Sequence, residues 1–187
     1  MKKRVFPRHA KAFAKPIRVS PLGRRQVGIT PRIREYVAGF EAKGLKGVDL
    51  AKAITRDIAE FQKVALATKK AQRLWAKRSA DDIIKTKKIY VAKYEEKVPA
   101  RERGVIMGCT DMAVAVAASL RTAGFKVLIA REFLHTYTKF FYRGKVYIAD
   151  AQEEKRNIVR QMSPADKRRE ESCERKPCRR SASGSGT

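Results

Sequence analysis

The stretch from residue 105 to residue 151 constrains the fold of this chain more than any other part. Small apolar residues between positions 113 and 120 lie on one face of a helix that ends at Gly124. Three segments rich in β-branched and aromatic residues follow, at 125–131, 135–142 and 145–149. Arg143-Gly144 predicts a tight hairpin turn between the last two. The pattern predicts a closely buried helix followed by three strands.

The residues before this stretch predict helices. Thr30-Pro31 is typical of a capping residue followed by proline at the first helical position, and Gly44 ends that helix. An apolar stripe then predicts a second, longer helix from about Asp49 to Lys77. Ser79-Ala80-Asp81-Asp82 has the form of a capping box, so a short helix should begin there. Residues 89–91 indicate a brief strand.

These patterns divide the chain into three parts. Residues 1–30 contain three prolines, many positive charges and no apolar period, which predicts a disordered arm. Residues 31–152 form the predicted domain, with a helical part at 31–86 and a core at 105–151. Residues 153–187 are charged, then small and polar, which predicts a tail of low order.

The charge of the chain is its most unusual compositional feature. The 187 residues carry a formal net charge of +25, and residues 1–34 contain eleven Lys and Arg and no acidic residue. Such a field attracts nucleic acid without choice of sequence, although a solvated basic arm that only aids solubility is an equal alternative. No stretch approaches the roughly 20 apolar residues that cross a bilayer. The three cysteines are too few for a disulfide framework, so we expect a cytoplasmic protein.

Cys109 is the candidate nucleophile because it lies at the predicted start of the small-residue helix. Unpaired N–H groups and the positive end of the helix dipole favour a thiolate there, and the same N–H groups can stabilise an oxyanion. Gly108 leaves room for a substrate backbone to approach. Asp111 in the first turn is favourable for the helix and needs no further role.

His135 and Asp150 are the candidate base and orienting carboxylate. His135 is the only histidine outside the basic arm. With a turn at Arg143-Gly144, it lies at the same end of the predicted hairpin as Asp150. A carboxylate there can accept the Nδ1–H of the imidazole, fix its tautomer and stabilise its charged form.

Each of these residues also has a simpler explanation. A lone Cys at a helix start is commonly a small buried residue, a histidine among aromatic residues commonly packs, and Asp150 can simply end a strand. The shared register across the hairpin favours the catalytic interpretation. Cys173 and Cys178 form a C-x4-C pair without further ligands and do not make a zinc site.

Residues 78–151 resemble the core of the transglutaminase-like superfamily. Gly108-Cys109-Thr110-Asp111, the small-residue helix, Arg121 and Gly124 are similar to its Cys element. His135-Thr136-Tyr137, the Gly144 turn and Asp150 are similar to its His and Asp elements. Residues 78–84 resemble the helix that precedes the Cys element in microbial members. Tyr137 replaces a frequent Trp, and the insert at about 85–103 lies outside the family pattern.

The resemblance implies an α+β, papain-like fold in which the Cys-bearing helix packs on a small antiparallel sheet. It implies a Cys109–His135–Asp150 catalytic triad that transfers or hydrolyses the acyl group of a protein or peptide amide, without a cofactor or metal. Members include transglutaminases, proteases and amidases, and some inactive modules. The alternative is therefore an inactive module of this fold that binds nucleic acid through the basic arm at 1–34.

Overall fold

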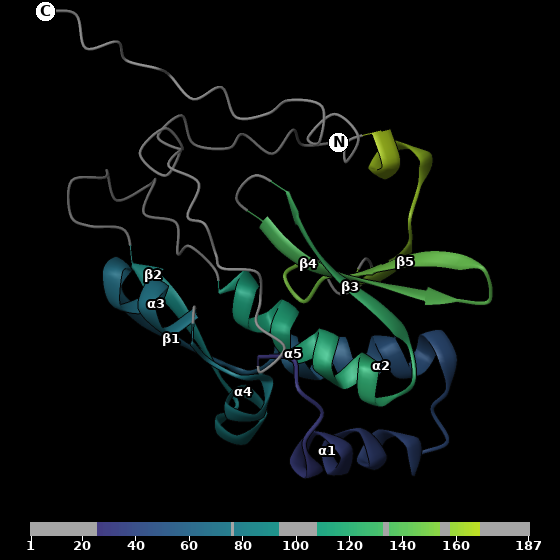
Figure 1. The fold of residues 1–187 in the computed structure, drawn as a ribbon, viewed down its shortest axis with the longest axis horizontal. Coiled ribbons are helices and arrows are strands. Elements are labelled where there is room, and N and C mark those ends of the chain that lie inside the picture. Colours follow the sequence, from purple (N-terminus) through teal and green to yellow (C-terminus); the bar gives the residue numbers. More distant parts are fainter. Residues whose placement is uncertain (1–25, 76, 94–107, 133–134, 154–157, 169–187) are drawn as a thin grey trace, which may run out of the picture.

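The fold is α+β, with helices wrapped around one central helix and an antiparallel sheet on its other side (Figure 1). The computed structural model describes residues 26–75, 77–93, 108–132, 135–153 and 158–168. The central helix is α5, Cys109–Thr122, and all residues from Thr110 to Leu120 are buried. Its small side chains let the sheet and the other helices approach it closely, as the sequence pattern predicts.

The first helices begin and end as expected from their caps. In α1, Pro31–Glu41, the Thr30 side chain accepts a hydrogen bond from the Ile33 N–H, and Pro31 takes the first position. Gly44 then adopts a positive φ of 77°. In α4, Ala80–Thr86, both hydrogen bonds of the Ser79–Asp82 capping box are present. These local predictions are confirmed.

The long helix predicted from Asp49 to Lys77 is wrong. Three elements occupy this stretch: α2 (Gly47–Ala59), β1 (Gln62–Ala67) and α3 (Thr68–Trp75). Up to Ile58 the apolar residues are buried at helical spacing, but Val64 and Leu66 alternate with exposed neighbours, which is the period of a strand. β1 pairs in parallel with β2, Lys88–Lys93, so the brief strand expected at 89–91 is confirmed and extends further.

The main sheet has the strand order β3-β4-β5-β6, with every neighbouring pair antiparallel. Its strands are β3 (Lys126–Glu132), β4 (His135–Tyr142), β5 (Lys145–Ala149) and β6 (Val159–Gln161). Arg143 and Gly144 both have positive φ, 49° and 72°, in the tight turn between β4 and β5. The predicted hairpin is therefore confirmed.

The sheet continues past Gln152, where the sequence pattern ends the domain. β6 adds a fourth strand on β5, and residues 164–168 form a helical turn. The Arg160 guanidinium donates two hydrogen bonds to Asp166, which ties this turn to β6. The predicted low-order tail is thus wrong for residues 158–168. Most of the basic arm, residues 1–25, and the pair Cys173 and Cys178 lie outside the described residues.

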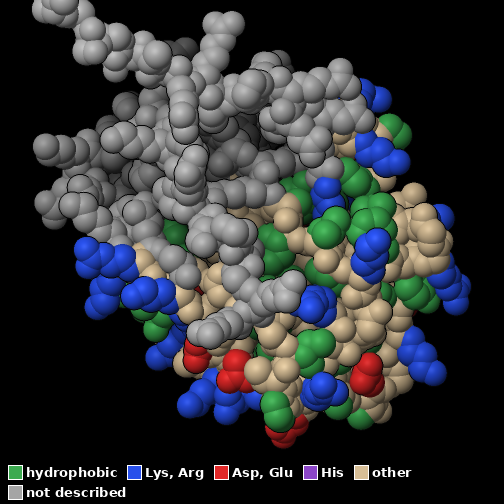
Figure 2. Space-filling view, viewed as in Figure 1, with side chains coloured by type: hydrophobic (Ala, Val, Ile, Leu, Met, Phe, Trp, Pro, Cys, Tyr) green, Lys and Arg blue, Asp and Glu red, His purple; other side chains and the backbone are tan. Residues whose placement is uncertain are grey.

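The described surface is rich in basic side chains. Figure 2 shows one face on which Lys and Arg lie along the right, lower and lower left outline of the described part, whereas Asp and Glu gather in the lower part, where Figure 1 places α1 and α4. Among the described residues, no helix has the length and apolar character needed to cross a membrane.

Candidate active site

Cys109 is the first residue of α5, and the structure explains why a glycine precedes it. A Cβ on Gly108 would lie 2.4 Å from the Tyr90 carbonyl oxygen and 2.7 Å from the Ile89 side chain. The space beside Gly108 is therefore filled by β2. The expectation that this space admits a substrate backbone is wrong. Gly108 allows the start of α5 to press against β2.

His135 and Asp150 lie at the same end of the sheet, as the hairpin register predicts. His135 begins β4, Asp150 follows β5, and Thr138 pairs with Ala149 between them. The His135 Nε2 and Asp150 Oδ2 atoms are 2.5 Å apart. The expectation that Nδ1 would contact Asp150 is wrong: the far nitrogen of the ring reaches across to the neighbouring strand.

Asp150 is itself held by the backbone around it. Its Oδ1 atom accepts a hydrogen bond of 3.0 Å from the Gln152 N–H, while its Oδ2 atom is hydrogen-bonded to the His135 imidazole. Its own N–H donates to the Ile158 carbonyl at 2.9 Å, next to β6. Both carboxylate oxygens are used, so the carboxylate faces the imidazole in one fixed orientation.

The Cys109 thiol and the His135 imidazole are hydrogen-bonded to each other. Because Nε2 contacts Asp150, the Nδ1 atom is the one available to the sulfur. The ring also stacks on Tyr137, with centroids 5.8 Å apart. A chain of contacts therefore runs from sulfur to imidazole to carboxylate, and all three residues proposed from the sequence meet at one point.

The electrostatics of this cluster favour a thiolate beside an imidazolium. Burial raises the pKa of the Cys109 thiol, but the hydrogen bond and charge of His135, together with Thr136, outweigh it, so the pKa is lowered. Burial lowers the pKa of His135, but Asp150 and Cys109 raise it to about 10. Both shifts favour the charged pair, a thiolate on Cys109 and an imidazolium on His135.

The sequence analysis missed the pairing of Asp111, two residues after Cys109. The Asp111 carboxylate is buried and forms an ion pair with Arg78, a residue just before α4. Burial raises the pKa of Asp111 to about 6, although Arg78 and the Tyr90 N–H favour its charged form. The available signal was an acid directly before an unbroken apolar run, residues 112–118, but its partner lies 33 residues away.

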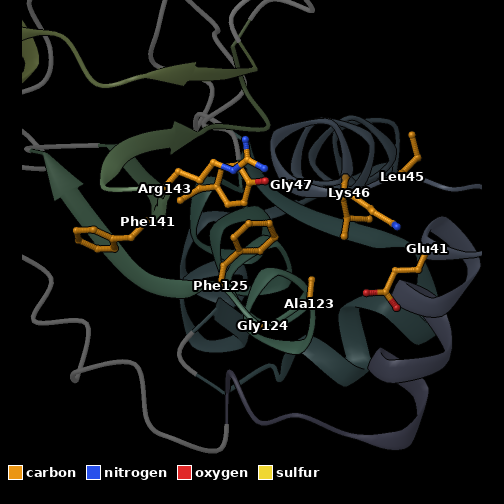
Figure 3. A pocket seen from close by; sticks show the side chains of 11 residues that line it. Glu41, Leu45, Lys46, Gly47, Ala123, Gly124, Phe125, Phe141 and Arg143 are labelled. Carbon is orange, nitrogen blue, oxygen red and sulfur yellow. The ribbon is translucent and has the colours of Figure 1, made fainter.

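Two further features contribute nothing to this cluster. The Trp75 indole N–H donates to the Tyr90 carbonyl at 2.7 Å, which is a packing role. A cavity of about 420 Å³ lies at the opposite end of α5, between the α1–α2 connection and the β4–β5 turn, and Phe125 and Arg143 are among its lining residues (Figure 3). No group of acidic, Cys or His residues suited to a metal ion occurs in the part of the chain that the structure describes.

Comparisons of the chain with known protein families, with curated proteins and with solved structures find no match.

Proposed function

We propose that this chain is a transglutaminase-like, cysteine-dependent enzyme that transfers or hydrolyses the acyl group of a protein or peptide amide. The observation that supports it is the chain of contacts from Cys109 through His135 to Asp150, with the sulfur at the start of a 14-residue helix. Cys109 would be the nucleophile, His135 the general acid and base, and Asp150 the group that orients the imidazole.

The first half of the reaction forms a thioester. The Cys109 thiolate attacks the amide carbon, and the carbonyl electrons move onto oxygen, near the N–H groups of the first turn of α5. Gly108 has no side chain that could accept from these N–H groups. When the oxyanion collapses, the C–N bond breaks and the His135 imidazolium gives its proton to the departing nitrogen. Ammonia or an amine leaves, and the acyl group stays on sulfur.

The second half returns the enzyme to its starting state. Neutral His135 takes a proton from water or from an incoming amine, whose oxygen or nitrogen bonds to the thioester carbon. The C–S bond breaks and sulfur leaves as a thiolate beside the restored imidazolium. Asp150 keeps the ring oriented in both halves and stabilises its charged form.

The experiment that tests the proposal is alkylation of the chain by iodoacetamide at pH 6, followed by peptide mapping. An ordinary thiol is less than about 1% thiolate at this pH, so we expect Cys109 to react at least roughly tenfold faster than Cys173 in the same chain. Replacing the base by His135→Gln should remove this advantage. Equal rates at Cys109 and Cys173 in the wild-type chain would rule out an activated nucleophile.

A second candidate function is an inactive module of this fold that binds nucleic acid. The supporting observation is the basic arm, because nine of the eleven positive charges of residues 1–34 lie in residues 1–25. Deletion must stop there, since the Gln26 side chain donates to the Trp75 and Arg78 carbonyls. If the arm binds, retention on heparin and on duplex DNA should fall steeply with salt and weaken without residues 1–25. Equal retention of both chains would contradict it.

A further inference from the structure

We propose that Arg78 is a positioning residue for Cys109, acting through its ion pair with Asp111 to fix the first turn of α5 opposite His135. This inference rests on the proposed function, because it concerns the geometry of the same nucleophile.

Arg78 connects the start of α5 to two neighbouring elements, α4 and β2. Its guanidinium is only 8% exposed and pairs through one nitrogen with the Asp111 carboxylate. The other terminal nitrogen donates to the Thr86 hydroxyl at 3.1 Å and to the Lys88 carbonyl at 3.0 Å. The guanidinium also lies over the Tyr90 ring, 4.3 Å from its centroid. Arg78 thus links the end of α4 and the start of β2 to the first turn of α5.

Asp111 is the point on α5 that receives this link. Its side chain is 1% exposed, and its Oδ2 atom accepts from the Tyr90 N–H at 3.2 Å as well as from Arg78. The carbonyl of the same Tyr90 faces Gly108, the capping residue directly before α5. One residue of β2 therefore contacts α5 on both sides of Cys109.

A second contact fixes α5 from the side of the sheet. The Thr138 hydroxyl donates to the Ala113 carbonyl at 3.0 Å, and Thr138 lies three residues after His135 in β4. With Asp111 held on one side and Ala113 on the other, the helix cannot turn about its axis without breaking a buried polar contact. A turn of roughly 20° would move the sulfur by roughly 2 Å, which is enough to break its hydrogen bond to His135.

The Asp111→Asn substitution removes both the negative charge and the ion pair with Arg78. The two losses have opposite effects on the pH at which the Cys109 thiolate forms. A negative charge two residues from Cys109 disfavours the thiolate, so removing only the charge of Asp111 lowers the pH at which the thiolate forms. Losing the ion pair instead loosens the first turn, weakens the contact with His135 and raises that pH. The positioning role predicts the second result.

The test measures the rate of iodoacetamide alkylation against pH in the full chain carrying Cys173→Ser and Cys178→Ser, so that Cys109 is its one remaining thiol. We expect the midpoint of the profile to rise by about one pH unit or more in Arg78→Met and in Asp111→Asn. Arg78→Lys should give a smaller rise, because the lysine ammonium keeps the positive charge opposite Asp111 but loses the hydrogen bonds to Thr86 and Lys88.

The matched control is Arg32→Met, which breaks the ion pair between Arg32 of α1 and Asp81 of α4 without touching α5. It should lower the unfolding temperature and leave the midpoint unchanged. Midpoints that stay constant or fall in Arg78→Met and Asp111→Asn would overturn the positioning role. If Arg78→Met does not fold, the alkylation midpoints of Arg78→Lys and Asp111→Asn test the positioning role in its place. An ordinary thiol midpoint in the parent chain would instead contradict the proposed function itself.

Discussion

The two ends of α5 differ in what holds them. At its start, Cys109 and Asp111 meet His135, Arg78 and a backbone group of β2 through hydrogen bonds and ion pairs. At its end, the Gly124 turn leads into Phe125, whose ring packs edge-on against Phe140 and Tyr142 with centroids 5.1 and 5.9 Å apart. The first end is fixed by buried polar contacts, whereas the second is held mainly by apolar packing, with one exposed hydrogen bond from Arg121 to the Val27 carbonyl at 3.1 Å.

The two ends of α5 therefore have different roles. Hydrogen bonds depend steeply on distance and angle, so the polar end fixes the position of the sulfur. Apolar contacts are non-directional and contribute mainly to the free energy of folding. Substitutions at the first end should therefore change both reactivity and stability, whereas substitutions at the second should change stability alone.

Gly108→Ala should have the largest effect. The added methyl group would meet the Tyr90 carbonyl at 2.4 Å, and because that atom belongs to the backbone of β2, α5 itself must shift. We expect a loss of about 3 kcal/mol in the free energy of unfolding, and a rise in the pH midpoint of Cys109 alkylation. Denaturant unfolding and the alkylation profile measure the two effects.

The control for this variant is Gly39→Ala in α1, where a Cβ meets nothing within 4 Å. It should leave reactivity unchanged and stabilise the chain by up to about 1 kcal/mol, since alanine is the better helix former. A Gly108→Ala chain with wild-type stability and reactivity would show that β2 does not constrain the nucleophile.

Phe125→Ala should have the intermediate effect, on stability only. The ring is half-buried and lines the cavity at the far end of α5 (Figure 3), so its loss should cost about 2 kcal/mol, below the value for a fully buried ring. The alkylation midpoint of Cys109 should stay at the wild-type value. A shift of that midpoint would mean that packing at this end also positions the sulfur.

Gly124→Ala should have the smallest effect. Gly124 has a φ of 83°, which strains an L-residue, but a Cβ there would meet nothing within 4 Å. The cost should be about 1 kcal/mol, with no change in reactivity. A clearly larger loss in denaturant unfolding would show that the turn after α5 carries more than local backbone strain.

Sequence patterns predicted the helix caps and the hairpin turn, because residues close together in the chain determine these features. The caps at Thr30 and Ser79, the turn at Arg143-Gly144 and the helix from Cys109 all depend on residues a few positions apart. The meeting of His135 with Asp150 followed from these, because the turn alone sets the register of the hairpin.

Contacts between distant residues were not predictable in the same way. The strand character of β1 depends on its partner β2, which begins 26 residues later, with Gln62 opposite Lys88. β6 has three residues, too few to show a period. The pairing of Arg78 with Asp111, and the nitrogen that His135 offers to Asp150, depend on how whole elements pack, which spacing along the chain does not specify.

The position of β6 also has a consequence for the order in which the site forms. Asp150 is held through its N–H by Ile158, and β6 follows directly, so the orienting carboxylate depends on chain that is synthesised after it. On a translating ribosome Cys109 emerges first, His135 second, and the support of Asp150 last. We expect the Cys109 thiol of the nascent chain to gain its reactivity only after β6 has been added to the sheet.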